Sequence, residues 1–203
     1  MEKEFANLQE TQHNALPTDN DNENTTPVEN TNQENSYNEE VNLITPENEI
    51  VIDPFLLSSY STKILTNDSN RYNNIKIVSD KLNGYLLGAG QTFSYNEVCG
   101  PYGESDGFLE APVLLSDGTE TKGFGGGVCQ LSSTLYNAIK TLDVDITERH
   151  HHSAPVAYVP KDEDATVSMQ SDLDFKFINN TGKTLRFDTA YDPDNLTVKV
   201  YEQ

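Results

Sequence analysis

Apolar residues recur at helical spacing in two stretches of the chain, residues 70–82 and 128–142. In each stretch they fall on one face of a helix, and Gly84 follows the first where a glycine commonly ends a helix. The apolar positions are Ile75, Val78 and Leu82 in the first stretch, and Val128, Leu131, Leu135, Ala138, Ile139 and Leu142 in the second. We predict one helix over residues 70–82 and another that begins at the glycine run 125–127 and ends near Asp143.

Apolar and polar residues alternate with period two elsewhere, which predicts strands. One strand is expected at residues 55–62, and another at 111–115 turns at Asp117 and Gly118. Residues 85–98 are also expected to be extended. Further strands are predicted at residues 144–146, 155–159, 165–168, 173–178, 185–190 and 196–201, with hairpin turns at 179–182 and 192–195. Two or three helices packed on a mainly antiparallel sheet make an α+β domain.

The first 50 residues have a different composition from the rest of the chain. They carry twelve Asp and Glu against the single Lys3, many Asn, Thr and Gln, and few large apolar side chains. Such a segment buries too little apolar surface to offset the entropy of ordering it. We therefore predict a disordered, acidic, Asn-rich tail or linker over residues 1–50, and one domain with its own core over residues 51–203.

The charge of the chain limits its partners. The formal net charge of the 203 residues is −20. Nucleic acid and anionic membrane surfaces are bound by basic clusters, which the sequence lacks, so we exclude both. No stretch is long and apolar enough for a transmembrane helix, and residues 1–6 lack the features of a signal peptide. If the chain is complete as given, a cytoplasmic location is expected.

The strongest candidate for chemistry is Cys129, in the run Gly-Gly-Gly-Val-Cys-Gln at residues 125–130. Its thiol falls in the first turn of the second predicted helix, where unpaired N–H groups and the helix macrodipole favour the thiolate. The other cysteine, Cys99, is expected to be a small buried residue, or to pair with Cys129 in an oxidising compartment.

Partners for a nucleophilic thiol follow downstream. Such a thiol needs a base and a third group that orients the base. In an extended segment His150 and His152 share one face while His151 points to the other, so only two of the three serve one site. We favour His152 as the base, because the predicted strand 155–159 would fix its ring, with His150 as the second choice. Asp164 is the predicted orienting carboxylate.

Other residues near Cys129 supply the remaining parts of a thiol-dependent site. The Cys129 N–H, together with the Gln130 amide or an N–H of the glycine loop, would stabilise an oxyanion. The glycines would let a substrate approach the backbone closely. The predicted substrate-binding residues are Gly125, Gly126, Gly127, Arg149 and Tyr158. The expected reaction is attack on an amide or ester through an acyl-thioenzyme, and the order Cys, His, Asp is similar to that of transglutaminase-like and papain-like folds, a fold-level analogy.

Three other interpretations of these residues stay open. In one, Cys129 is a buried structural residue and the glycines provide positive φ. Separately, residues 132–134 are expected on the helix surface or in its first turn, and none of them is predicted to be a nucleophile. In another, a zinc ion has four ligands, without the paired spacing typical of structural zinc sites. Those ligands are Cys129, His150, His152 and Asp164; no other cofactor is predicted. The last is a non-catalytic binding module, whose stacking surface would comprise Tyr95, Tyr102, Phe108 and Tyr158.

A series of motifs along residues 55–200 resembles one protein family. The motifs include Asn70-Arg71-Tyr72-Asn73-Asn74-Ile75, Gly90-Gln91-Thr92-Phe93-Ser94-Tyr95-Asn96, the segment from Gly125 to Ala138, Glu148-Arg149-His150, His152-Ser153, Tyr158-Val159-Pro160, Asp164-Ala165-Thr166-Val167 and Asp174-Phe175-Lys176-Phe177. On these motifs the chain is similar to the VanW family. It departs from the usual pattern at Ala89, His151 and Lys161-Asp162, and the last two departures change the loop that leads to Asp164.

The resemblance carries expectations of its own. The family is bacterial, is named for an accessory protein of vancomycin B-type resistance clusters, and usually lies outside the membrane beside peptidoglycan-binding modules. It implies a location in the cell envelope. It also implies that a stem peptide of peptidoglycan is the substrate of a cysteine-dependent amidase, peptidase or transpeptidase, or the ligand of a non-catalytic resistance accessory module.

Overall fold

The computed structural model describes residues 53–115 and 117–203. The predicted tail over residues 1–50 lies outside this part of the chain. The described residues form an α+β fold whose strand pairs are antiparallel, which confirms the predicted class. Its helices are α1 (Ser69–Leu82), the short α2 (Tyr95–Cys99) and α3 (Val128–Ile139).

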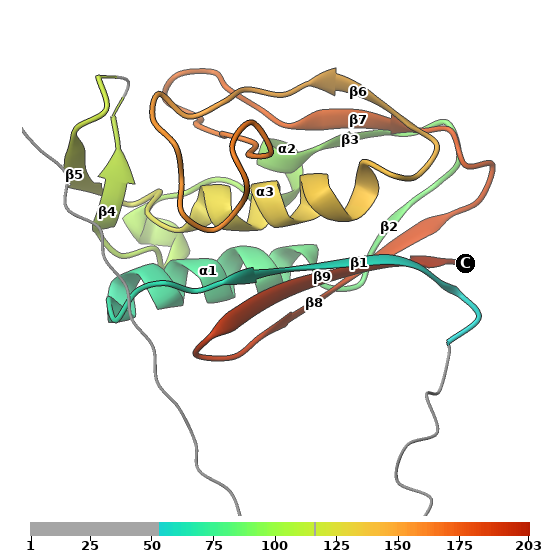
Figure 1. Ribbon diagram of the computed structural model, residues 1–203, viewed down its shortest axis with the longest axis horizontal. Coiled ribbons are helices and arrows are strands. Elements are labelled where there is room, and N and C mark those ends of the chain that lie inside the picture. Colours follow the sequence, from blue (N-terminus) through green and yellow to red (C-terminus); the bar gives the residue numbers. More distant parts are fainter. Residues whose placement is uncertain (1–52, 116) are drawn as a thin grey trace, which may run out of the picture. The chain divides into compact units, whose positions relative to one another are not determined.

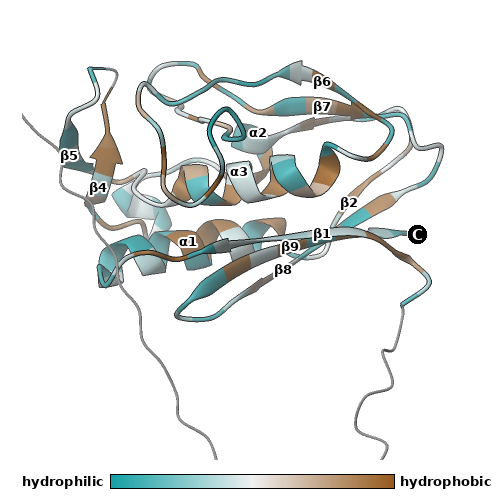
Figure 2. Cartoon of the chain, in the orientation of Figure 1, coloured by the Kyte–Doolittle hydropathy of each residue, from teal (hydrophilic) through white to brown (hydrophobic). Residues whose placement is uncertain are grey.

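The larger sheet has four strands in the order β1-β9-β8-β2. They are β1 (Leu56–Lys63), β9 (Asn195–Glu202), β8 (Leu185–Tyr191) and β2 (Tyr85–Leu87). The predicted turn at 192–195 joins β8 to β9, and this end of the hairpin is hydrophilic (Figure 2). α1 packs against β8, whereas α3 packs against β1, β9 and α1 (Figure 1).

Two smaller sheets complete the fold. A three-stranded sheet has the order β3-β7-β6, and a hairpin joins β4 to β5. The strands are β3 (Thr92–Ser94), β7 (Lys176–Asn179), β6 (Val144–Glu148), β4 (Ala111–Leu114) and β5 (Glu120–Gly123), and a single 3-10 turn spans Glu104–Asp106. Between the three-stranded sheet and α3, Tyr136 packs edge-on against Phe175 with 5.9 Å between ring centroids.

Both predicted helices bury the face that their apolar spacing defines. Every apolar position predicted to face the core is buried, apart from Leu142, which is half-buried. The Asp68 side chain caps α1 by accepting a hydrogen bond from the Arg71 N–H at 2.9 Å. Gly84 follows α1 with φ +77°, and its N–H donates to Phe187 O at 2.7 Å, which leads the chain directly into the large sheet.

The structure corrects the strand and turn predictions in four places. Residues 95–99 form α2 instead of extended chain, because Ser94 Oγ accepts from the Glu97 N–H and starts a helix there. Residues 155–159 form no strand, and 165–168 make only isolated bridges, such as His150 with Thr166. The turn at 179–182 makes no hairpin, because β7 and β8 lie in different sheets.

Candidate active site

Cys129 lies in the first turn of α3 because two glycines let the chain enter the helix between β4 and α1. Gly127 precedes the helix at φ +104°, a backbone conformation that side chains disfavour. A Cβ on Gly126 would lie 2.7 Å from the Cβ of Ala111. Gly125 has open space around it. Backbone geometry and packing therefore account for Gly126 and Gly127, and close approach of a substrate stays a prediction for Gly125.

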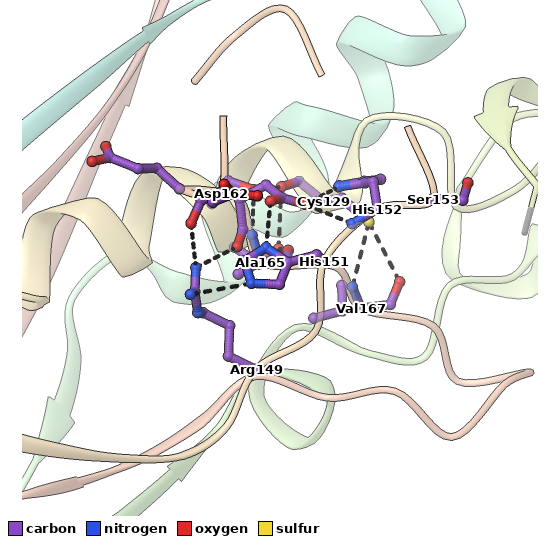
Figure 3. Close-up of polar contacts among 12 residues, drawn as sticks. Cys129, Arg149, His151, His152, Ser153, Asp162, Ala165 and Val167 are labelled. Carbon is purple, nitrogen blue, oxygen red and sulfur yellow. Dashed lines mark hydrogen bonds and ion pairs between the residues drawn. The ribbon is translucent and has the colours of Figure 1, made fainter. Parts of the chain in front are cut away.

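Cys129 is half-buried, and its sulfur contacts the backbone of Val167. Sγ lies 3.4 Å from Val167 O and 3.5 Å from Val167 N (Figure 3). The carbonyl can accept from a thiol, and the N–H can donate to a thiolate, so this backbone suits both protonation states. No residue of the described chain accepts a hydrogen bond from the Cys129 N–H, which leaves that donor available to a ligand.

His152 and Asp164 meet beside Cys129. Nδ1 of His152 lies 2.6 Å from Asp164 Oδ2, and the backbone N–H of His152 donates to the same oxygen at 2.7 Å. Figure 3 shows the sulfur of Cys129 between His152 and Val167. Because the carboxylate occupies Nδ1, Nε2 is the ring nitrogen left to serve the thiol.

The surroundings of His152 and Asp164 favour the charged form of both side chains. Burial acts against the ionised carboxyl of Asp164, but hydrogen bonds from His151 and His152 outweigh it and lower its pKa to about 2. Burial also opposes protonation of His152, whereas Cys129 and Asp164 favour it, and the net effect raises the pKa of His152. The arrangement therefore stabilises an imidazolium at His152 beside the Asp164 carboxylate.

Side chains of α3 fasten the loop that carries Asp164. Asn137 Nδ2 donates to Glu163 O at 2.8 Å, and Ser132 Oγ donates to Ala165 O at 2.5 Å. Ser133 Oγ accepts from the Ala165 N–H at 2.9 Å and donates to Cys129 O at 2.7 Å. Ser132, Ser133 and Thr134 are fully buried and follow the first turn of α3, so the prediction that they lie on the helix surface or in its first turn is wrong.

The three histidines do not alternate as an extended strand would require. His151 Nδ1 lies 2.8 Å from Asp164 Oδ1, so His151 and His152 share one carboxylate. His150 instead points to Glu148, with Nε2 3.0 Å from Oε1. The second choice of base, His150, is therefore held by a different carboxylate from the one that contacts His152. The side chain of His151 is 46% exposed and that of His152 only 9%, so His152 is the enclosed ring.

Gln130 does not offer its amide to a ligand. Its side chain is buried, and Nε2 donates to Lys63 O at 2.8 Å and Thr62 Oγ1 at 3.2 Å. Oε1 accepts from Arg71 Nη2 at 3.1 Å. The amide links α3 to β1 and α1, so its predicted role as an oxyanion donor is wrong.

Arg149 and Tyr158 border the site in different ways. Arg149 Nη1 donates to Asp162 O and Asp164 O at 3.1 and 2.9 Å, and its guanidinium carbon lies 4.1 Å from the ring centroid of Tyr136. These contacts hold the Asp164 loop in place. The ring of Tyr158 packs edge-on to His152 at 6.5 Å. Burial, followed by the nearby Cys129, raises the pKa of the Tyr158 phenol, so it stays a hydroxyl donor at neutral pH.

The remaining alternatives fit the structure poorly. In residues 53–115 and 117–203, no group of three or more His, Cys, Asp or Glu is arranged to hold a metal ion, and His150 points to Glu148. Both cysteines are free, and Cys99 is buried, which raises the pKa of its thiol to about 12. Tyr95 and Phe108 are fully buried and cannot form part of a stacking surface.

Among the helices of the described chain, we find none with the length and apolar character needed to span a bilayer.

The fold and the site define an α+β domain with a half-buried thiol at a helix start. The pattern of the family described as VanW like protein matches residues 70–201, and the chain belongs to this family.

Two curated relatives share this domain. One is the uncharacterized protein YoaR of Bacillus subtilis, which is 36% identical over 123 residues, covering 61% of this chain and 40% of YoaR. Another is the vancomycin B-type resistance protein VanW of Enterococcus faecalis, which is 26% identical over 137 residues, covering 65% of this chain and 49% of that protein. The matched region thus spans less than half of each relative. No solved structure matches this chain with statistical significance.

Proposed function

We propose that Cys129 is the nucleophile of a thiol-dependent amidase, peptidase or transpeptidase. The observation that carries this proposal is the position of His152, whose ring contacts the Asp164 carboxylate through Nδ1 and lies beside the Cys129 sulfur (Figure 3). A base held between an orienting carboxylate and a nucleophile is the arrangement that cysteine acyl transfer requires.

The reaction follows from these contacts. The Cys129 thiolate attacks the carbonyl carbon of an amide or ester, and the new oxyanion accepts a hydrogen bond from the Cys129 N–H. His152 gives its proton to the leaving amine or alcohol as that bond breaks, which leaves a thioester on Cys129. Water or an amine then gives a proton to His152 as it attacks the thioester carbonyl. The C–S bond breaks, the acyl product is released, and the Cys129 thiolate and protonated His152 are restored.

Family membership suggests the substrate class. One relative carries vancomycin B-type resistance in its name, and the substrate we propose is a peptide related to the peptidoglycan stem. The corresponding location is the cell envelope. The non-catalytic accessory role is less favoured, because the aromatic side chains expected to form its binding surface include the buried Tyr95 and Phe108.

Selective alkylation tests the nucleophile. We expect iodoacetamide at pH 7 to modify Cys129 much faster than the buried Cys99, with each site followed by peptide mass spectrometry. His152→Ala is expected to slow the reaction of Cys129 by roughly tenfold or more, because the thiolate loses its counter-ion. His151→Ala is the matched control, since His151 also contacts Asp164 but is the exposed ring, and it should change the rate by less than about threefold.

Acyl-enzyme trapping tests the substrate. Incubation with peptidoglycan-derived peptides should add the mass of an acyl group to the native protein and not to the Cys129→Ala variant.

Two results of the alkylation experiment would refute the proposed mechanism. One is a native Cys129 that is inert to iodoacetamide, and the other is an equal slowing of alkylation by His151→Ala and His152→Ala.

A further inference from the structure

A guanidinium group lies at the start of the helix that carries Cys129. Arg71 is in the first turn of α1, and its backbone O lies 3.0 Å from the position that a Cβ on Gly127 would take. Its Nη2 donates to the side chain of Gln130 at 3.1 Å. Because Nε2 of Gln130 is in turn held by Lys63 O, the guanidinium is fixed in place.

Arg71 lacks the partners that the other two described arginines have. Arg186 pairs with Asp188 at 2.9 Å, and Arg149 donates to two backbone carbonyls. In residues 53–115 and 117–203, no carboxylate lies within ion-pair distance of Arg71, although the chain is strongly acidic. A guanidinium has five N–H donors in a planar fork, and Gln130 is the one side chain that engages it there.

Tyr158 relates Arg71 to the candidate nucleophile. After burial, the two largest influences on the pKa of the Tyr158 phenol are Cys129, which raises it, and Arg71, which lowers it. Both groups therefore act on the same phenol, whose ring also packs against His152. Geometry places the Arg71 side chain at the same helix start: its Cγ lies 3.3 Å from the position of a Cβ on Gly127, and its Nη2 reaches the side chain of Gln130, the residue after Cys129.

We propose that Arg71 binds a carboxylate of the substrate, so that the site selects peptides with a free carboxylate close to the carbonyl that Cys129 attacks. The inference rests on the proposed function of Cys129. A planar guanidinium binds carboxylates through two parallel hydrogen bonds, which fixes the orientation of the bound group as well as its charge. Half-burial of Arg71 makes such a pair stronger than one in open water.

Two alkylating reagents that differ in charge test this inference without a known substrate. Iodoacetate carries a carboxylate next to its reactive carbon, whereas iodoacetamide is neutral. We expect Arg71→Gln to lower the ratio of the iodoacetate rate to the iodoacetamide rate at Cys129 by roughly three- to tenfold. The substitution removes the positive charge and keeps a polar side chain. Arg186→Gln is the matched control, because it makes the same change in net charge away from Cys129 and should leave the ratio unchanged.

The outcomes separate this inference from the proposed function. A reactive Cys129 whose reagent ratio is the same in Arg71→Gln as in the native protein overturns the role of Arg71 alone. A Cys129 inert to both reagents refutes the proposed function, and this inference with it. If Arg71→Gln does not fold, competition in the native protein decides: N-acetylalanine should slow alkylation by iodoacetamide by about twofold or more, and N-acetylalaninamide should not. Equal protection by the two overturns the inference.

Discussion

Replacing Asp164 by asparagine separates the charge of this residue from its shape. Asp164 accepts hydrogen bonds from the rings of His151 and His152 and from one backbone N–H, and its pKa is lowered from 3.8 to about 2. A difference of this size between the folded and unfolded states corresponds to about 2 kcal/mol of stability at pH 6, at about 1.4 kcal/mol for each unit.

The sign of this contribution sets its pH dependence. The folded-state pKa of Asp164 lies below the unfolded value, so the stabilisation is complete above about pH 4 and disappears as pH falls through about 2. We therefore expect Asp164→Asn to destabilise the domain by about 2 kcal/mol at pH 6 and by about half that at pH 3. For a domain of this size the loss at pH 6 corresponds to roughly 4–8 °C in melting temperature.

Urea unfolding at the two pH values measures the effect. Asp162→Asn is the control, because Asp162 is exposed, lies in the same loop, and has φ +65°, which asparagine tolerates. The asparagine at 164 also presents an N–H₂ group to one imidazole, and where this faces Nδ1 of His152 it selects the tautomer with the proton on Nε2. Alkylation of Cys129 should then slow together with the loss of stability. A destabilisation equal at pH 3 and pH 6, or one below about 0.5 kcal/mol at pH 6, would contradict the electrostatic argument.

Two further predictions concern the entry to α3. Gly127→Ala should destabilise the domain by about 1–3 kcal/mol, because residue 127 has φ +104° and a Cβ there would lie too close to Arg71 O. Gly125→Ala is the control: Gly125 has open space around it, so the change should cost less than about 0.5 kcal/mol in the same urea titration. Gln130→Leu should lower the free energy of unfolding by about 1–3 kcal/mol, because the Lys63 carbonyl loses its hydrogen-bond donor. An unchanged urea midpoint would show that the Gln130 amide does not stabilise the contact between α3 and β1.

The spacing of apolar residues predicted correctly those elements whose own sequence determines which face is buried. The spacing of Ile75, Val78 and Leu82 places α1 correctly, since a helix buries whichever face is apolar. The five-residue α2 escaped prediction because its start depends on a single cap, Ser94, in a stretch that alternates like a strand. Residues 155–168 also alternate, but their backbone bonds to side chains of α3 instead of to a neighbouring strand, as with Ala165 and Ser133.

The candidate site divides in the same way. Cys129, His152 and Asp164 were named from residue type, and the structure brings them together. The roles of Gln130 and His151 depend on contacts with residues distant in the sequence, and one sequence alone does not predict those contacts. One signal was present: Cys129, Ser133 and Asn137 are spaced by four, which places two hydrogen-bonding side chains on the helix face of the thiol.

That shared face bears on how the site tolerates change elsewhere in the molecule. Ser133 and Asn137 hydrogen bond to the backbone on either side of Asp164. The distance between the Cys129 sulfur and the Asp164 carboxylate is therefore set mainly by the rise of α3 and not by how the sheets pack. Substitutions that loosen the sheets can lower stability and still leave this distance intact. The strands of the sheets can therefore change in sequence faster than the residues of the site. Relatives with altered strands can keep the same distance between the thiol and the carboxylate.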